Sequence, residues 1–540
     1  MREYELKPNK GASSELLHGA MLLGLASILS KIIGTFQKIP LQNIGGDGVF
    51  GIYNAVYPFY VLLSTAAAAG IPIAISRLVA SQETSGEHGG TRELLLAALI
   101  LVEIIGMAGF IAMYTQAEQL AAWIGNTHTI PAIQASSYAL LVIPLAAVLR
   151  GYEQGQGRMA SSAISQVVEQ FARVTVMVVL LIMLTNQSAA DEVIAAGAVF
   201  GSFAGGVVGL ILLALMMYAR GPIRCRASQR VSLRSLLIWM KRIAWTAIPI
   251  CLGALVTPMV NVVDVFTVPR MLLYEGWTEA EAMMEYGLYS RALPLTQLIT
   301  LTAGSLVVGL VPAIAAAWKR GGVHETQGII RGSIQTALLL GSAAAVGLIV
   351  LSKPINIALY TNNEGSTAFV LLSFTALAGT LQVVSAALLQ GMGALRAPVV
   401  HLLVAAVLKL VLNIMLVPNL GIDGAGWSAI IALSAAAALN MASLAQQAGL
   451  GWSAWLRHPL RLALSLLGMG VMAWLSSAVV MSILGDGRFA AVLATAAAIP
   501  AGVTVFTLLA MRLRIIEPEE WAIIPKLGWR LEAMAWRLQR

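Results

Sequence analysis

The chain has 540 residues, of which 58% are hydrophobic and only 11% charged, and its mean hydropathy is +0.81. These values exclude an ordinary soluble globular protein and indicate a membrane protein. The net charge of +8 would suit a nucleic-acid-binding protein, but the positive loops of a membrane protein explain it equally well, so we expect no nucleic-acid partner.

Long apolar segments follow one another from residue 16 to residue 511. At 1.5 Å per helical residue, most are long enough to cross a hydrocarbon core of about 30 Å. They lack the polar/apolar alternation of membrane β-barrel strands. The sequence therefore predicts an all-α polytopic membrane protein with about 14 transmembrane helices. The expected spans are 16–39, 52–76, 93–114, 130–149, 160–185, 193–219, 241–266, 286–316, 333–352, 367–390, 397–417, 424–446, 459–483 and 488–511.

The Lys and Arg residues alternate between the two sides of these segments. Of the 34, 26 lie in the N-terminal tail, the C-terminal tail and the loops after even-numbered segments. Only Arg270, Lys353 and Arg488 lie in the opposite loops. Because short cytoplasmic loops carry the excess of Lys and Arg, we predict a multi-pass protein of the cytoplasmic membrane with both termini in the cytoplasm. The polar N-terminal tail predicts no cleavable signal.

Several sequence features recur at nearly constant offsets, which suggests an internal duplication. Gly51-x-Tyr53-x4-Pro58 recurs as Gly287-x-Tyr289-x4-Pro294, Gly151, Glu169 and Arg173 recur in position as Gly391, Lys409 and Asn413, and Pro40 corresponds to Pro269. Each half would hold six helices, an even number, so the two repeats would be parallel. We therefore expect two six-helix lobes plus two extra C-terminal helices.

The expected domains follow from this repeat and from the basic linker between segments six and seven. Trp521, Trp529 and Trp536 are interleaved with Lys and Arg near the C-terminus, which is typical of an amphipathic helix at the membrane interface. The expected limits are 1–219 for the N-terminal lobe, 220–242 for the cytoplasmic linker, 243–447 for the C-terminal lobe, 448–512 for helices 13 and 14, and 513–540 for the interfacial tail.

Five cations and three acids fall inside apolar segments. The cations are Lys31, Lys38, Arg173, Arg291 and Lys409, and the acids are Glu103, Glu169 and Asp264. Each ionised side chain at the membrane centre costs roughly 2.5–3.5 kcal/mol. Pairing, water or a ligand must offset that cost. The excess of cations predicts a cavity suited to an anionic substrate such as a phosphate group.

The individual roles of these residues remain open from spacing alone. Lys31 and Arg291 have no acid three or four residues away, which favours a role in a substrate cavity, and Lys38 could share it or extend to the outer interface. Glu169 and Arg173, four residues apart on one helix face, could neutralise each other.

Three further residues have two interpretations each. Lys409 could pair with Glu169 across the repeat or contribute to function, and Asp264 could be a partner of Arg291 or a cation site. Glu103 is a further candidate for the cavity or for ion coupling, although the coupling ion itself is not specified by the sequence. The sequence contains no phosphate-binding loop, metal-ligand spacing or nucleophile motif, so we expect no enzyme, no metal and no cofactor.

Four stretches resemble a known family. SKIIGTFQKIPLQNIGGDGVFGIYNAVYPFY, GIPIAISRLVA, LRGYEQGQGRMASSAISQVVEQFARV and LQGMGALRAPVVHLLVAAVLKLVLN are similar to the stage V sporulation protein B group of polysaccharide biosynthesis proteins. This group belongs to the multidrug/oligosaccharidyl-lipid/polysaccharide exporter superfamily and is related to the MurJ lipid II flippases. The resemblance implies 14 helices in two lobes and alternating-access movement of an undecaprenyl-diphosphate-linked saccharide.

The resemblance also bears on the expected substrate-binding residues. The flippase motif Ser-Arg-x-x-Gly-x-x-Arg-Asp corresponds to Ser30–Lys38, where Lys31 keeps the first cation and Gln37-Lys38 replace the Arg-Asp pair. Arg291 matches the Arg of the helix-eight stretch. Alternative functions are a cation-coupled multidrug exporter, which should prefer an acidic cavity, and a non-transporting membrane scaffold in envelope or spore assembly. The sequence leaves the saccharide unspecified.

Overall fold

The structure, a computed structural model, describes residues 10–85, 90–220, 232–451, 455, 458–515, 532–534 and 536–537. Within these ranges the chain forms helices and no strand. It divides into two compact units, Met1–Gly287 and Leu288–Arg540, and each is described by itself.

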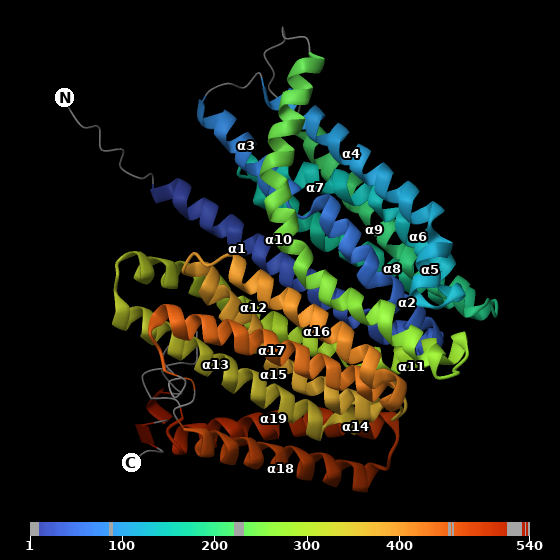
Figure 1. Cartoon of the computed structure of the whole chain (residues 1–540), viewed down its shortest axis with the longest axis vertical. Helices are drawn as coiled ribbons and strands as arrows, with labels where there is room; N and C mark the ends of the chain where they lie inside the picture. Colours follow the sequence, from blue (N-terminus) through green and yellow to red (C-terminus); the bar gives the residue numbers. More distant parts are fainter. Residues whose placement is uncertain are drawn as a thin grey trace. The chain divides into compact units, whose positions relative to one another are not determined.

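Unit 1 is a bundle of helices in which α8 and α9 pack along each other (Figure 1). Its helices are α1 (Lys10–Phe36), α2 (Lys38–Ala68), α3 (Ile71–Ser85), α4 (Thr91–Thr115), α5 (Ala117–Ile124), the short 3-10 helix η1 (Thr127–Thr129), α6 (Ile130–Ser137), α7 (Ala139–Gly155), α8 (Met159–Asn186), α9 (Asp191–Ala219), α10 (Leu233–Tyr274) and most of α11 (Glu279–Ser290).

Small residues set the distance between α8 and α9. A Cβ atom at Gly201 would lie 2.7 Å from the carbonyl oxygen of Arg173, and one at Gly205 would lie 2.6 Å from that of Glu169. Glycine at these positions lets the two backbones approach closely, as is common between membrane helices. The close packing fixes the part of α8 that carries Glu169 and Arg173.

The chain reverses direction inside α2. Gly46 has φ +78° and ψ 177°, which interrupts the helix. Gln37 Nε2 donates to Tyr53 Oη and Lys38 Nζ to Asn54 Oδ1, both at 3.0 Å, although each pair is 16 residues apart. In a straight helix such residues would be about 24 Å apart. The turn around Gly46 therefore separates two antiparallel helices.

The number of membrane-crossing helices agrees with the sequence. Among the described residues, 12 helices are long and apolar enough to cross a membrane, or 13 with the bent pair Glu279–Gly304 and Gly309–Lys319. One of the 12 is the 62-residue stretch Met21–Gln82, which spans about 93 Å if straight and contains the reversal at Gly46. Dividing it there gives 13 spans, or 14 when the bent pair is also counted, and the predicted all-α polytopic fold is confirmed.

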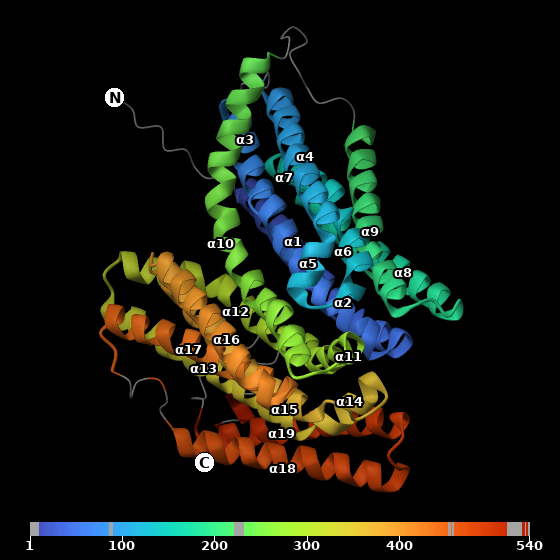
Figure 2. The ribbon, with the colours of Figure 1, turned by 45° about the vertical axis from the view of Figure 1, so that its right-hand side comes forward.

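Unit 2 contains three adjacent long helices, α15, α16 and α17, and a C-terminal pair, α18 and α19, that pack on each other (Figure 2). Its helices after the end of α11 are α12 (Leu293–Lys319), α13 (Val323–Val350), α14 (Ser352–Tyr360), α15 (Ser366–Gly391), α16 (Arg396–Leu420), α17 (Ile422–Ala448), α18 (Pro459–Leu484) and α19 (Arg488–Arg512).

The boundary between the compact units differs from the boundary inferred from the repeat. Packing places it after Gly287, whereas the sequence placed the lobe boundary in the basic linker. The helix that follows the linker, α10, packs on α2 and α4, and its Ile243 and Ala247 join a unit 1 core with Leu94. Linker residues 221–231 and most of the C-terminal tail, Trp521 and Trp529 included, lie outside the described residues. The repeat-based domain limits stay a prediction.

Candidate functional site

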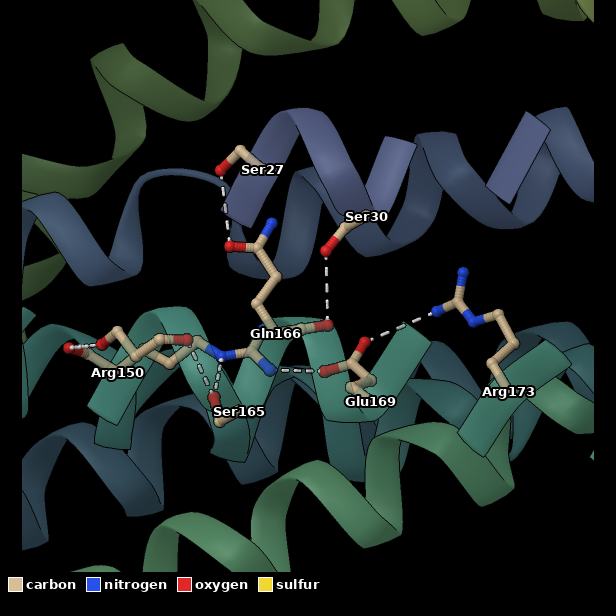
Figure 3. Close-up of polar contacts among 8 residues, drawn as sticks. Ser27, Ser30, Arg150, Ser165, Gln166, Glu169 and Arg173 are labelled. Atoms are coloured by element: carbon tan, nitrogen blue, oxygen red, sulfur yellow. Dashed lines mark hydrogen bonds and ion pairs between the residues drawn. The ribbon is translucent and has the colours of Figure 1, made fainter. Parts of the chain in front are cut away.

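Glu169 of α8 lies between two arginines (Figure 3). Arg150 Nη2 donates to Glu169 Oε2 at 2.6 Å, and Arg150 Nε donates to Ser165 Oγ at 2.9 Å. Arg173 Nη2 lies 3.5 Å from Glu169 Oε1, so the predicted ion pair one helical turn apart is present. Arginines of unit 1 thus engage both carboxylate oxygens, and one carboxylate faces two positive charges.

Arg150 is a contributor that the sequence analysis missed. The fourth span was expected to end at residue 149, which placed Arg150 in a loop, but α7 continues to Gly155. An additional turn of helix therefore brings Arg150 alongside α8. The sequence around Arg150 gave no sign of this contact, because its partner Glu169 lies 19 residues further along the chain.

Arg173 is buried beside a row of tyrosines. Its exposed fraction is 9%, and its Nε has no hydrogen-bond partner among the described residues. It interacts electrostatically with Tyr53, Tyr57 and Tyr60 of α2. These three lie on one face of α2, where the rings of Tyr53 and Tyr57 stack at a centroid distance of 5.3 Å. The positive charge thus lies near the three phenols and shares its carboxylate partner with Arg150.

Lys38 is a buried cation bonded to a neutral group. Its exposed fraction is 7%, and its Nζ donates to the amide oxygen of Asn54 at 3.0 Å. Asn54 is held in turn by its own Nδ2, which donates to the Phe50 carbonyl oxygen at 2.7 Å. Lys38 therefore lies inside the protein rather than extending to the interface. Lys31, by contrast, is exposed, so the two lysines have different environments.

A row of polar side chains joins α1 to α8 beside Glu169 and its two arginines (Figure 3). Ser27 Oγ and Ser30 Oγ donate to the side-chain and backbone oxygens of Gln166, both at 3.4 Å. Gln170 Nε2 donates to Gln37 Oε1 at 3.5 Å. All three bonds are long, which indicates weak hydrogen bonding along this interface. Sequence reasoning missed this row because uncharged polar residues are common in transmembrane helices.

Arg291 of unit 2 lies in the break between α11 and α12. It is 1% exposed, and its Nη1 donates to Asn356 Oδ1 at 3.2 Å, to Asn362 Oδ1 at 2.6 Å and to the Glu364 carbonyl oxygen at 3.2 Å. Its guanidinium lies 5.3 Å from the ring centroid of Tyr360. The Asn356 partner is 65 residues away in sequence and the others are farther, which explains why spacing did not identify them.

The remaining candidates occupy separate places in the fold. In unit 1, Asp264 is buried on α10 and interacts electrostatically with Tyr286, and Glu103 of α4 has one buried carboxylate oxygen without a hydrogen-bond partner in the described part of the chain. In unit 2, Lys409 and Asn413 are buried one turn apart on α16. In the part of the chain that the structure describes, the three acids form no group that could hold a metal ion, and the roles predicted for the individual residues stay predictions.

Comparison with known proteins places this architecture in a family. The model of the polysaccharide biosynthesis protein family matches residues 16–318, which is more than half of the chain. The chain belongs to the polysaccharide biosynthesis protein family. The resemblance to this family that the sequence motifs indicated is thereby confirmed.

Relatives of this family member include three proteins of Bacillus subtilis (strain 168). The uncharacterized membrane protein YabM is 33% identical over 515 residues, which cover 94% of each chain. Lipid II flippase MurJ is 28% identical over 76% of this chain and 79% of its own. Stage V sporulation protein B is 25% identical over 96% of this chain and 99% of its own.

Solved structures support the fold of this polysaccharide biosynthesis family member. Lipid II flippase MurJ in an inward closed conformation superimposes with a TM-score of 0.65 over 91% of this chain and 98% of that chain, at 14% identity. A multidrug resistance MATE family transporter of the MOP superfamily, in an inward-facing conformation, gives a TM-score of 0.65 over 78% and 94%, at 15% identity. At such identities the likeness establishes a helical transporter fold alone.

Proposed function

We propose that this protein is an alternating-access flippase that moves an undecaprenyl-diphosphate-linked saccharide across the cytoplasmic membrane. Lys31, Lys38 and Arg291 contact the diphosphate of the cargo. The protein changes the location of the cargo and makes or breaks no covalent bond in it. Both termini face the cytoplasm, as the distribution of Lys and Arg indicates.

The observation that carries this proposal is the buried Lys38 ammonium with an amide as its partner. An ionised side chain inside a membrane costs roughly 2.5–3.5 kcal/mol. A carboxylate at position 54 would compensate the charge permanently, whereas the neutral Asn54 fixes the ammonium and leaves its charge to attract an anion. A phosphate oxygen is an anion of the kind that lysine binds as a point charge.

The net charge of Arg150, Glu169 and Arg173 also favours an anionic cargo. Two guanidinium groups and one carboxylate leave one positive charge in this part of unit 1. An acidic site would favour an exporter of cationic drugs. A non-transporting scaffold would gain nothing from buried charges whose energetic cost it has to offset. The relatives named as a lipid II flippase and a sporulation protein support a cargo linked to envelope construction.

The test is a flipping assay with the purified full chain in liposomes. Fluorescent undecaprenyl-diphosphate-linked saccharide is incorporated in both leaflets, and a membrane-impermeant quencher reports the fraction that reaches the outer leaflet. We expect complete quenching with the wild-type protein and about half with protein-free liposomes. Half quenching with the wild-type protein, together with accumulation of a cationic dye, would assign the chain to the drug exporters. A scaffold would move neither compound.

The matched control for Lys38→Gln is Lys319→Gln, which keeps Lys38 and removes a positive charge at the C-terminal end of α12. We expect Lys38→Gln to slow quenching about tenfold to a hundredfold, because a charge-assisted contact contributes about 1.5–3 kcal/mol. Lys319→Gln should leave the rate unchanged. Equal rates for both variants would contradict the proposed diphosphate site.

A further inference from the structure

Polar side chains of three helices meet near one end of α16 and α17 in unit 2. His401 of α16 has two partners on α17, since its Nδ1 lies 2.8 Å from Asn440 Oδ1 and its Nε2 lies 3.5 Å from Ser443 Oγ. Asn440 extends the contact to α15, because its Nδ2 donates to the Gln382 carbonyl oxygen at 3.3 Å. One imidazole thus connects three helices that pack on one another (Figure 2). We call these four residues the His401 cluster.

The hydrogen bonds of Asn440 determine which nitrogen of His401 carries a proton. A backbone carbonyl oxygen can only accept, so the side of the amide that faces Gln382 must be its NH2 group. The amide oxygen of Asn440 therefore faces the imidazole, and Nδ1 must donate to it. In the neutral ring Nε2 then holds the free lone pair. Its partner, the Ser443 hydroxyl, lies at the limit of hydrogen-bond distance, so Nε2 is the nitrogen that is open to a second proton.

The His401 cluster lies close to helix ends. His401 is five residues beyond Arg396, where α16 begins, and Ser443 is five residues before Ala448, where α17 ends. Both are about 8 Å from ends that the distribution of Lys and Arg assigns to the cytoplasmic side. His401 and Ser443 are partly exposed, whereas Asn440 is fully buried. The open nitrogen and its hydroxyl partner are therefore on the more accessible side of the cluster.

The helices that form the His401 cluster offer no nearby acid. α15 contains no charged or titratable residue, and the only acid of α17 is Asp423, about 30 Å along the helix from Ser443. The other charged residues of α16 are cations. They are Arg396, which is exposed, and Lys409, which is buried about 12 Å beyond His401. A positive charge on His401 would thus have two cations and no nearby acid on these helices.

A proton on Nε2 would change the balance of this contact. The Ser443 oxygen can accept as well as donate, so both ring nitrogens would keep a hydrogen-bond partner. All of these partners are neutral, however, and a charge that is removed from water without a counter-charge is costly. The protonated ring is more stable where water can reach it. Protonation therefore favours an arrangement in which this end of α16 has moved apart from α15 and α17.

We propose that the His401 cluster is a proton-binding site, in which one proton from the cytoplasm binds to His401 Nε2 and loosens the contact of α16 with α15 and α17. Histidine suits this role, because its charge ordinarily changes between pH 5 and 8. The proton adds to a free lone pair, and no other bond forms or breaks. The site concerns the packing of unit 2 alone and does not depend on the cargo. A cluster that only fixes three helices would stay neutral and closed over this range of pH.

The first experiment observes the proton directly by nitrogen NMR. The full chain is produced with isotope-labelled histidine and placed in lipid nanodiscs, and the signals of His401, one of six histidines, are those missing from His401→Gln. At about pH 8 we expect a protonated Nδ1 and an unprotonated Nε2, and at about pH 5.5 two protonated nitrogens. A ring that is in the same state at both pH values would overturn the proposal.

The second experiment measures whether the helix contact loosens. Leu444 of α17 is fully buried and shares a core cluster with Val384 of α15. Leu444→Cys is made in an otherwise cysteine-free chain, and its rate of labelling by a maleimide is divided by the rate of Gln446→Cys, an exposed position of α17. This ratio removes the effect of pH on thiol reactivity. We expect the ratio to rise about tenfold between about pH 8 and pH 5.5, and a constant ratio would contradict the proposal.

Substitutions within the His401 cluster separate the proton from the packing. His401→Gln keeps a neutral side chain, so its labelling ratio should stay low at both pH values. Asn440→Asp places an acid beside the ring, so His401 should hold both protons already at about pH 8 while the ratio stays low. The matched control is His324→Gln, which removes an exposed histidine of α13 in unit 2 and should keep the full response to pH. A response to pH that persists in His401→Gln would show that the proton binds elsewhere and would overturn the proposal.

Discussion

Lys38 and Asn54 show how one neutral atom can determine the charge of a membrane site. The Lys38 ammonium and the Asn54 amide oxygen are 3.0 Å apart, and both residues are buried. Asparagine and aspartate have nearly the same shape, so replacing one by the other changes the charge of the site with little change in packing. This pair can therefore separate a requirement for charge from a requirement for fold.

We expect Asn54→Asp to lower flipping of the diphosphate-linked saccharide about tenfold or more, because the new carboxylate neutralises Lys38 and competes with the phosphate. Its melting temperature should change little, since the ammonium gains an ion-pair partner while the Phe50 carbonyl oxygen loses the Asn54 Nδ2 donor. Asn54→Leu should lower the melting temperature instead, because it leaves a buried ammonium without its acceptor, at a cost of about 1–3 kcal/mol or more. Undiminished flipping by Asn54→Asp would mean that the charge of Lys38 does not act on the cargo.

Arg291 should respond differently from Lys38, because it holds a chain break together. Its guanidinium connects the end of α11 to Asn356, Asn362 and the Glu364 carbonyl oxygen. We expect Arg291→Gln to destabilise unit 2 by about 2–5 kcal/mol, since it leaves the buried Asn356 amide oxygen without its donor and removes two further hydrogen bonds, to Asn362 and Glu364. Arg291→Lys should recover only part, because an ammonium lacks the planar fork of donors.

Thermal unfolding of the purified variants measures this effect. The variant Asn356→Gln is a useful companion, because it disturbs one acceptor of the same guanidinium and leaves the charge of Arg291 intact. A wild-type unfolding temperature for Arg291→Gln would mean that Arg291 does not stabilise the break between α11 and α12.

At the scale of single elements, the main feature of α8 is that it places the Glu169 carboxylate between two arginines. We expect Glu169→Gln to destabilise unit 1 by about 3–5 kcal/mol, because removal of one partner leaves buried charges uncompensated. The control is Glu325→Gln, which breaks an exposed pair with Arg320 and should cost less than about 1 kcal/mol. Denaturation in detergent compares the two variants, and equal stabilities would show that water already compensates the buried arginines.

The sequence predicted these elements where the relevant signal was local. The apolar segments predicted the helices, and the four-residue spacing predicted the Glu169–Arg173 pair, which the structure contains. Arg150 was missed because the apolar signal ends before α7 does, so composition located the edge of the membrane but not the end of the helix.

The sequence also could not identify hydrogen-bond partners that are distant along the chain. The acceptors of Arg291 come from α14 and the turn after it, and their positions depend on how unit 2 packs. Asn54 is only 16 residues from Lys38, but the pairing requires the reversal at Gly46. The glycine-rich run indicated a turn there, yet nothing in the sequence indicated which residues the turn would bring together.

At the scale of the whole molecule, the alternation of charged loops predicts the orientation in the membrane. Single cysteines at Ser228 and Glu281, in a chain without Cys225 and Cys251, should react with an impermeant maleimide from opposite sides. We expect Glu281→Cys to be labelled in intact cells and Ser228→Cys only after the membrane is permeabilised, because short basic loops stay in the cytoplasm. The reverse pattern would invert the predicted topology.

Gly51 of α2 and Gly287 of α11, which occupy equivalent positions of the predicted repeat, exchange equivalent contacts, because a Cβ atom at either glycine would lie 3.2 Å from the backbone nitrogen of the other. A contact in which each residue touches the equivalent of its own partner is isologous, the form found in symmetric dimers of identical subunits. A duplicated segment retains such a contact when the parent segment already made it with a second copy of itself. On the predicted duplication, this contact corresponds to a subunit interface of a six-helix ancestor, which gene fusion would have made intramolecular.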